Sequence, residues 1–321
     1  MKSRHWILGS SLPLLLAASC GFAATPEPHR IEVASEQREY LLVTPESMPP
    51  GPRPLVLVLH GHLGTAANAL GGGRSPSPLS AWLDIAEREK VLVAALQGLK
   101  GSDDRTGWRD CRADADDNPR VDDVEFAARV ATTLVDGGRA DVKRIYVMGM
   151  SNGAMMTLRL ALEMRPAPAA VAAVAGTMAA KSNCTDAELP VSVLLIHGTS
   201  DPLVPYEGGS VGLGENRNRG SVVGVDVTRD YWLRADGLTS AKPTDYSFPH
   251  HGDDATRARK TTYGRDGGPQ VVVITIEKGG HVEPSKRYHY GALYTRIVGA
   301  QNRDLESAEE AWAFFATKKR P

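Results

Sequence analysis

The sequence has no block of like charges and no low-complexity linker, and both absences narrow what the protein can be. Its 37 Lys and Arg residues nearly balance its 38 Asp and Glu residues, which gives a formal net charge of −1. Because nucleic acids and anionic membranes bind through clustered basic side chains, we predict neither as a partner. We find no internal repeat and no Thr-, Ser- or Pro-rich linker, so the 321 residues are expected to share one core. A separate polymer-binding module is therefore not expected.

The apolar run at the N-terminus, residues 7–18, is too short to span a membrane. It follows the basic residues Lys2 and Arg4 and precedes a stretch of small residues. This order is typical of a secretory signal peptide rather than of a buried helix. We therefore predict a signal peptide over residues 1–24, and a periplasmic or secreted mature domain over residues 25–321.

Cysteine is sparse, with three residues in the whole chain. Cys20 lies in the predicted signal peptide, where Ala18-Ser19-Cys20 also resembles a loose lipoprotein box, so a lipid anchor at Cys20 is the alternative to simple cleavage before Thr25. Cys111 and Cys184 remain, an even pair that suits an oxidising compartment. We predict a disulfide between them, which would stabilise the fold by about 4 kcal/mol in the chain-entropy model. Two buried free thiols are the alternative.

Two kinds of apolar segment alternate along the mature chain. Continuous apolar runs, each expected to be a buried strand, occupy residues 54–60, 91–96, 144–148, 170–175, 191–197 and 271–276, and a further strand is expected at 39–44. Helices are expected at residues 79–90, from residue 121 onward, and at 154–164, 225–235 and 307–318. This alternation predicts one α/β domain with a mainly parallel central sheet flanked by helices. Residues 207–262 are expected to form a small partial cap.

The segment Gly149-Met150-Ser151-Asn152-Gly153 fits the pattern G-x-S-x-G. The pattern is weak by itself, but here a predicted buried strand precedes it and a predicted helix follows at once. A serine on such a turn has a strained backbone and an exposed hydroxyl, and a Cβ at either glycine would collide with the neighbouring strand or helix. We therefore predict that Ser151 is a nucleophile rather than a helix cap.

A serine hydroxyl needs an adjacent base, and that base needs an acid that orients it. In folds with this strand–turn–helix motif the acid and then the histidine follow the serine, each after a later strand. Asp201 stands just after the apolar run 191–197, and His281 just after the run 271–276. We therefore predict Ser151, Asp201 and His281 as a catalytic triad.

Other residues of the same types fit less well. His289 is the alternative base, and His197 is expected to be a packed, hydrogen-bonded histidine at the end of its strand. Asp226 and Asp230 lie on or beside a predicted helix, which is the wrong place for the acid.

An acyl-transfer site also needs N–H donors for the oxyanion. One should be the backbone N–H of Asn152, at the start of the helix, and the other should come from the loop after residues 54–60. In that loop His62 is our choice, with Leu63 second. His60 and His62 have no nearby third ligand at metal spacing, so no metal and no cofactor is expected.

Residues 100–120 form a long polar loop, and such loops often carry function. Trp108 in this loop either walls the acyl pocket or packs the loop onto the core beside Cys111. Tyr206, close behind Asp201, is open to the same two interpretations. Trp108, Tyr206 and Leu63 are our candidates for the substrate pocket.

Several segments together resemble one known family. They are residues 146–156 (YVMGMSNGAMM), 121–126 (VDDVEF), 197–206 (HGTSDPLVPY) and 279–281 (GGH). They resemble the polyhydroxybutyrate depolymerase-like esterases, a family that also holds feruloyl and acetylxylan esterases. The resemblance implies an α/β-hydrolase fold and an exported serine esterase, with Ser151, Asp201 and His281 as its triad.

The chain departs from that family in one place. Many relatives read Gly-Gly-His-Thr-Trp-Pro after the last strand, whereas this chain has Val282 and Glu283 after His281. The aromatic residue beside the histidine is missing, so the family's substrate preference is not carried over.

The leading hypothesis is hydrolysis of small or oligomeric carboxylic esters through an acyl-enzyme. Polyhydroxybutyrate oligomers, feruloyl esters and acetylated xylan are the candidate substrates. An acyltransferase on the same triad and a catalytically silent binding protein of the same fold are the alternatives. A peptidase ranks lower, because nothing in the sequence marks a gating domain.

Overall fold

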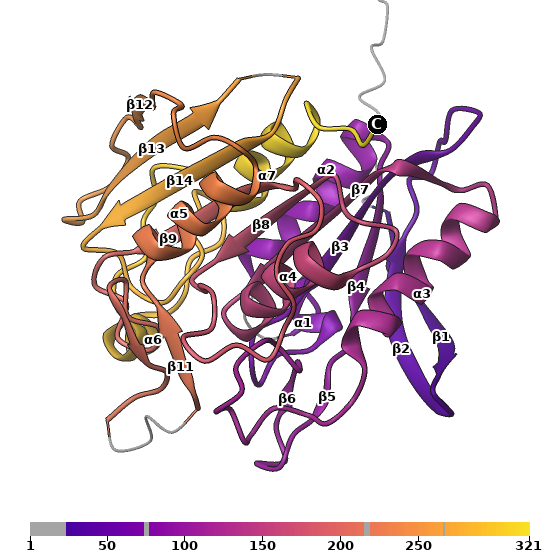
Figure 1. Cartoon of the computed structure of the whole chain (residues 1–321), viewed down its shortest axis with the longest axis horizontal. Helices are drawn as coiled ribbons and strands as arrows, with labels where there is room; N and C mark the ends of the chain where they lie inside the picture. The colour runs from indigo at the N-terminus through magenta and orange to yellow at the C-terminus, as the bar shows by residue number, and fades with distance from the viewer. Residues whose placement is uncertain (1–23, 74–76, 215–218, 266) are drawn as a thin grey trace, which may run out of the picture.

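A ten-stranded sheet forms the centre of the molecule (Figure 1). The computed structural model describes residues 24–73, 77–214, 219–265 and 267–321, so the predicted signal peptide and Cys20 lie outside it, apart from Ala24. The strand order is β1-β2-β4-β3-β7-β8-β9-β14-β13-β12. The six strands from β4 to β14 run parallel, and antiparallel strands extend both edges.

The sheet strands are bounded as follows: β1 (Glu27–Val33), β2 (Glu36–Val43), β3 (Arg53–Leu59), β4 (Leu92–Leu96), β7 (Ala140–Met150), β8 (Ala170–Val174), β9 (Ser192–Gly198), β12 (Thr244–Ser247), β13 (Arg257–Gly264) and β14 (Gln270–Glu277). Every residue of β4, β8 and β9 is buried, because helices cover both faces of the parallel part. Two short hairpins lie outside the sheet: β5 (Leu99–Lys100) with β6 (Thr106–Gly107), and β10 (Gly208–Ser210) with β11 (Ser221–Val223).

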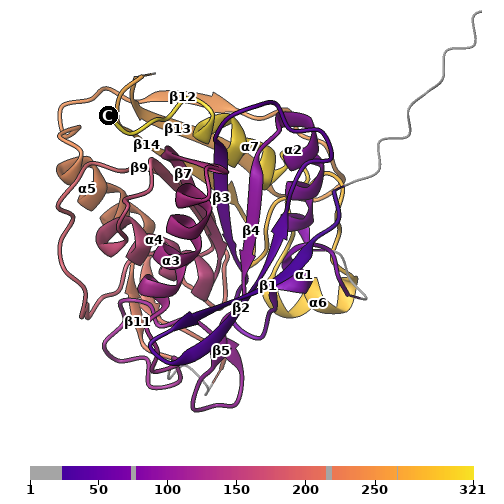
Figure 2. The same cartoon turned by 90° about the vertical axis from the view of Figure 1, so that its right-hand side faces the viewer.

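Helices lie in two layers, one on each face of the sheet (Figure 2). One layer contains α3 (Asp123–Asp136), α4 (Asn152–Glu163) and α5 (Val225–Ala235). The other contains α1 (Ala66–Ala69), α2 (Ala81–Glu89), the 3₁₀ turn Pro78–Ser80 before it, and α7 (Ser307–Phe315). Successive residues of the central strands pack alternately into the two layers, as the period of a strand requires. The remaining helix, α6 (Ala292–Val298), follows β14 in the chain and precedes α7.

A disulfide joins Cys111 to Cys184, as the sequence predicts. It ties the long loop after β4 to the segment that follows β8, and backbone hydrogen bonds between Ala113 and Lys181 and between Asn183 and Cys111 run beside it. The loop is therefore fixed against the helical layer that contains α4. Within the described residues, no helix combines the length and the apolar character needed to cross a bilayer.

The α/β fold with a mainly parallel central sheet is confirmed, whereas the expected partial cap is wrong for residues 225–262. In that segment α5 covers one face of the sheet, while β12 and β13 continue the sheet beyond β14. These strands are polar because they lie at an edge, where side chains are half exposed.

Candidate active site

Ser151 stands on a sharp turn between β7 and α4, and its backbone has φ 57° and ψ −121°. Such a positive φ is strained for a residue with a side chain. The flanking glycines are required by close approach: a Cβ on Gly149 would lie 2.3 Å from the carbonyl oxygen of Gly153, and one on Gly153 would lie 2.4 Å from that of His60. The turn has the geometry that presents a serine hydroxyl above a sheet.

His281 lies between Ser151 and Asp201. Its Nε2 is 2.8 Å from Ser151 Oγ, and its Nδ1 is 2.8 Å from Asp201 Oδ2. Since a carboxylate can only accept, Nδ1 carries the proton and Nε2 is left to accept from the serine. The imidazole and the carboxylate are both buried. The structure thus brings together the three residues that the sequence predicts, from the ends of β7, β9 and β14.

The carboxylate of Asp201 is held on both oxygens. Its Oδ1 accepts from the backbone N–H groups of Leu203 at 2.9 Å and Val204 at 2.8 Å. Burial alone would raise the pKa of Asp201, but the charges of His281 and His197 and their hydrogen bonds outweigh it, and hold that pKa well below its usual range. Asp201 is therefore ionised at neutral pH.

Neither competing histidine replaces His281 as the hydrogen-bond partner of Ser151 Oγ. His289 is exposed and does not line the cavity that contains Ser151. His197 is buried, as expected, with Nε2 2.9 Å from the carbonyl oxygen of Val204. Its Nε2 also lies 3.3 Å from Asp201 Oδ2, a contact that the sequence did not predict.

Two backbone N–H groups near Ser151 are available to an oxyanion. The N–H of Leu63 is not one of them, because it donates to the carbonyl oxygen of Thr106 at 2.9 Å. The N–H groups of His62 and Asn152 have no acceptor among the described residues. The geometry therefore favours His62 over Leu63 as the second donor, beside Asn152.

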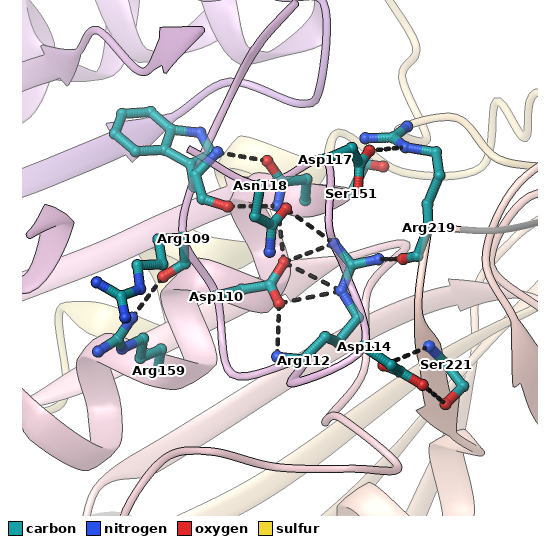
Figure 3. Close-up of polar contacts among 12 residues, drawn as sticks. Arg109, Asp110, Arg112, Asp114, Asp117, Asn118, Ser151, Arg159, Arg219 and Ser221 are labelled. Atoms are coloured by element: carbon teal, nitrogen blue, oxygen red, sulfur yellow. Dashed lines mark hydrogen bonds and ion pairs between the residues drawn. The ribbon is translucent and has the colours of Figure 1, made fainter. Parts of the chain in front are cut away.

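The side chain of Asn152 joins the nucleophile turn to the long loop after β4. Its Oδ1 accepts from the N–H of Trp108 at 2.7 Å, and its Nδ2 donates to Asp110 Oδ2 at 2.7 Å. Asp110 in turn receives the guanidinium of Arg112 on both oxygens, and both side chains are buried (Figure 3). Sequence analysis missed Asp110 and Arg112, and no motif in the sequence links this loop to Ser151.

A cavity of about 360 Å³ adjoins the Ser151 hydroxyl. Its apolar wall includes Leu63, Ala69, Leu79, Met150, Leu203 and Val298, and its polar wall includes Asn68, Ser77, Arg219, Glu283, Tyr290 and Tyr294. The candidate Leu63 therefore lines the cavity. Tyr290 precedes α6 and Tyr294 lies within it, and the sequence predicted no element in this part of the chain.

Trp108 and Tyr206 do not line this cavity. Trp108 is fully buried, its Nε1 donates to the carbonyl oxygen of His60 at 2.8 Å, and its ring lies 4.9 Å from the ring of His60. The hydroxyl of Tyr206 lies 3.1 Å from Thr275 Oγ1, over the sheet. Both aromatic residues pack loops onto the core, which was the second of the two interpretations.

Comparison with known proteins identifies the family of this chain. The family model described as Phospholipase/Carboxylesterase matches residues 121–212. NocK of Nocardia uniformis subsp. tsuyamanensis, which is named as an esterase, is 32% identical over 300 residues that cover 91% of this chain and 83% of NocK. Feruloyl esterase C of Emericella nidulans is 27% identical over 175 residues, or 54% of this chain and 58% of that protein. The chain belongs to the esterase family that contains NocK.

The fold of this member of the esterase family is also found in solved structures. An acetyl xylan esterase from Aspergillus awamori superposes with a TM-score of 0.52 at 15% identity, over 84% of this chain and 98% of that structure. At that identity the likeness shows the shared fold. The α/β-hydrolase fold and the esterase family that the motifs implied are therefore both confirmed.

One group of side chains near the site has the donor types of a metal site. His62, Asp103 and Asp117 offer ligand atoms that all lie within 4.8 Å of one another. No third ligand near His62 was expected from the sequence, because Asp103 and Asp117 follow it by 41 and 55 residues. His62 Nε2 already bonds Asp103 Oδ2 at 2.8 Å, and Arg219 forms an ion pair with Asp117. The arginine supplies the positive charge that these acids require.

Proposed function

We propose that the protein is an exported serine hydrolase that cleaves small or oligomeric carboxylic esters through an acyl-enzyme. One observation carries the proposal: hydrogen bonds of 2.8 Å connect Asp201 to His281 and His281 to the strained Ser151 beside a cavity. This is the arrangement that activates a serine hydroxyl at neutral pH.

In the first half-reaction Ser151 Oγ attacks the ester carbonyl carbon while His281 Nε2 takes its proton. The negative charge that develops on the carbonyl oxygen is stabilised by the N–H groups of His62 and Asn152, each worth about 3 kcal/mol in comparable sites. The bond to the alcohol oxygen then breaks, and His281 gives its proton to the departing alcohol. The acyl group remains on Ser151.

In the second half-reaction a water molecule attacks the acyl carbon and gives its proton to His281. The bond to Ser151 breaks, Oγ recovers the proton, and the carboxylic acid leaves. Asp201 stays ionised, since the charges of its histidine neighbours lower its pKa, and it stabilises the imidazolium that forms in both halves. These steps need no metal and no redox group.

The substrate class is supported by the size of the cavity and by the relatives. A volume of about 360 Å³ lies at the lower end of small-molecule sites and suits a short acyl or alcohol group. Relatives named as feruloyl esterase and a structural neighbour named as acetyl xylan esterase make feruloyl and acetyl-xylan esters reasonable probes. Hydroxybutyrate oligomers complete the set.

Export is supported by the Cys111–Cys184 disulfide, since such bonds persist in oxidising compartments. Expression of the full chain in a bacterium, followed by fractionation and mass spectrometry of the mature N-terminus, tests it. A chain that begins at Thr25 supports simple cleavage, a lipidated Cys20 supports the lipoprotein alternative, and an unprocessed cytoplasmic chain contradicts export.

The mechanism is tested with Ser151→Ala and with Ser210→Ala, a control at an exposed serine of β10. Hydrolysis of a short nitrophenyl ester and labelling by a serine-reactive phosphonate should both be lost in Ser151→Ala and unchanged in the control. Full activity in Ser151→Ala would refute the proposal. A wild-type protein that neither hydrolyses esters nor reacts with the phosphonate would instead be a binding protein. Added alcohols measure acyl transfer against hydrolysis.

A further inference from the structure

Glu283 is a buried carboxyl group in the wall of the cavity that contains Ser151 and His281. The side chain follows the proposed base by two residues and is 3% exposed. The mechanism does not use it.

Among the residues that the structure describes, the hydrogen bonds to Glu283 leave acceptor positions of its carboxyl group unfilled. The hydroxyl of Tyr290 donates to Oε2 at 3.0 Å, while the hydroxyl of Ser77 lies 3.5 Å from Oε1, which is long for such a bond. Within the described residues no Lys, Arg or His forms an ion pair with this carboxyl group. A carboxyl group has about four acceptor positions, and a buried one that lacks partners is unfavourable.

Burial raises the pKa of Glu283, and the hydrogen bonds from its own N–H and from Tyr290 only partly oppose this. A buried acid with unfilled acceptor positions is normally costly to a fold, and active-site cavities are where such groups tend to be found. The Tyr290 bond also fixes the carboxyl group, so an incoming donor would meet a preorganised acceptor.

We propose that Glu283, oriented by Tyr290, is a subsite that selects esters carrying a hydroxyl group near the scissile bond. This inference rests on the proposed ester hydrolysis at Ser151. A substrate hydroxyl would donate to the free positions of the carboxyl group, whereas a purely apolar substrate would cover the carboxyl group and leave it unpaired. An amine fits less well, because an ammonium group requires the ionised carboxylate that burial disfavours, while a hydroxyl can bond either form.

Four esters that differ in one group form the test: ethyl butyrate, ethyl 3-hydroxybutyrate, 2-hydroxyethyl butyrate and ethyl 3-aminobutyrate. Ethyl 3-hydroxybutyrate carries its hydroxyl on the acyl side of the scissile bond, and 2-hydroxyethyl butyrate carries it on the alcohol side. Comparing these two esters therefore shows on which side of the bond the subsite lies. The quantity measured is the kcat/KM for each substituted ester divided by that for ethyl butyrate. We expect the wild type to favour one hydroxylated ester about tenfold and the amine not at all.

Two variants distinguish the hydrogen-bond acceptor of the Glu283 side chain from the space that this side chain fills. Glu283→Leu should abolish the preference by lowering the kcat/KM ratio about tenfold, while Glu283→Gln, which keeps an acceptor oxygen, should keep the ratio within about threefold of the wild type. Glu277→Gln, at an exposed glutamate at the end of β14, is the matched control and should leave the ratio unchanged.

The wild type alone is decisive if Glu283→Leu does not fold. Equal kcat/KM on ethyl butyrate and on both hydroxylated esters overturns the subsite and leaves ester hydrolysis intact. A preference for the amine, or one that survives in a folded Glu283→Leu, also overturns it. Failure to hydrolyse any of the four esters would overturn the proposed function together with the subsite.

Discussion

The carboxylate of Asp110 accepts a hydrogen bond of 2.7 Å from the side-chain amide of Asn152, the residue that follows Ser151. Asp110 is itself held by the buried guanidinium of Arg112, whose loop is tied down by the Cys111–Cys184 disulfide. The backbone N–H of Asn152 is the proposed oxyanion donor, and its value depends on a position fixed within a fraction of an ångström. A buried ion pair and a disulfide therefore support the proposed oxyanion site.

Asp110→Asn should impair both stability and turnover. The change leaves the buried charge of Arg112 without its partner, and broken pairs of this kind destabilise folds by about 3 kcal/mol. In the folded fraction we expect kcat to fall about tenfold with little change in KM, because the oxyanion forms only in the transition state. Urea unfolding and steady-state kinetics on a nitrophenyl ester measure the two effects.

Asp114→Asn is the matched control for Asp110→Asn. Asp114 lies in the same loop and bonds Ser221 rather than the nucleophile turn (Figure 3). Its substitution should leave kcat unchanged. An Asp110→Asn variant that loses stability but keeps kcat would show that the network is structural and does not position the oxyanion donor.

Asp201→Asn should lower kcat by about 10⁴-fold, the effect seen when the acid of such a triad is replaced by its amide. The N–H groups of Leu203 and Val204 can still donate to the remaining oxygen, so the loop should keep its shape. The new amide would stabilise the wrong tautomer of His281. Asp226→Asn, at an exposed acid of α5, should retain full activity. Loss of activity in Asp226→Asn instead would mean that the acid has been assigned wrongly.

Replacing both disulfide cysteines, Cys111→Ser with Cys184→Ser, should lower the free energy of unfolding by about 4 kcal/mol in the chain-entropy model, given a separation of 73 residues. Reduction of the wild type should give the same loss, measured by urea unfolding with and without dithiothreitol. Equal stability of the oxidised, reduced and substituted proteins would show that the network of Asp110 and Arg112 alone holds the loop.

The buried parallel strands could be read from the sequence, since a strand covered on both faces must be a continuous apolar run. The predicted triad could be read too, because each member follows such a run. By contrast, β1 has one buried residue in seven and gave no apolar signal. In α6 the apolar side chains Leu293 and Ile297 are 77% and 55% exposed, so periodicity could not reveal which face packs.

Contacts between distant loops could not be predicted from one sequence. Asn152 and Asp110 are separated by 42 residues, and Glu283 and Ser77 by 206, and no local pattern records either pair. The role of Trp108 could not be predicted for a related reason: a tryptophan in a loop can line a pocket or pack the loop onto the core. The hydrogen bond from its indole to the backbone of His60, seen in the structure, shows that Trp108 packs the loop onto the core. Residues proposed to determine substrate specificity are thus harder to predict from one sequence than the proposed catalytic residues.

Asp236, at the C-terminal end of α5, should make stability depend on pH. Its Oδ1 accepts from the N–H of Val191 at 3.0 Å, while its Oδ2 is buried without a donor among the described residues. Burial raises the pKa of Asp236 from 3.8 to about 7, and the Val191 bond opposes this in part. Because the folded pKa lies above the unfolded one, the stabilising contribution is complete below pH 4 and is lost as the pH rises through 7.

Asp236→Asn resembles the protonated acid and should remove this dependence. The variant should match the wild type at pH 4 and exceed its free energy of unfolding by about 4 kcal/mol at pH 8, since each pKa unit corresponds to about 1.4 kcal/mol. Urea unfolding at a series of pH values measures the difference. Asp136→Asn, at an exposed acid that ends α3, should show no such trend between pH 5 and 8. A difference between Asp236→Asn and the wild type that stays constant with pH would mean that Asp236 is already ionised in the folded protein, and that a donor reaches its second oxygen.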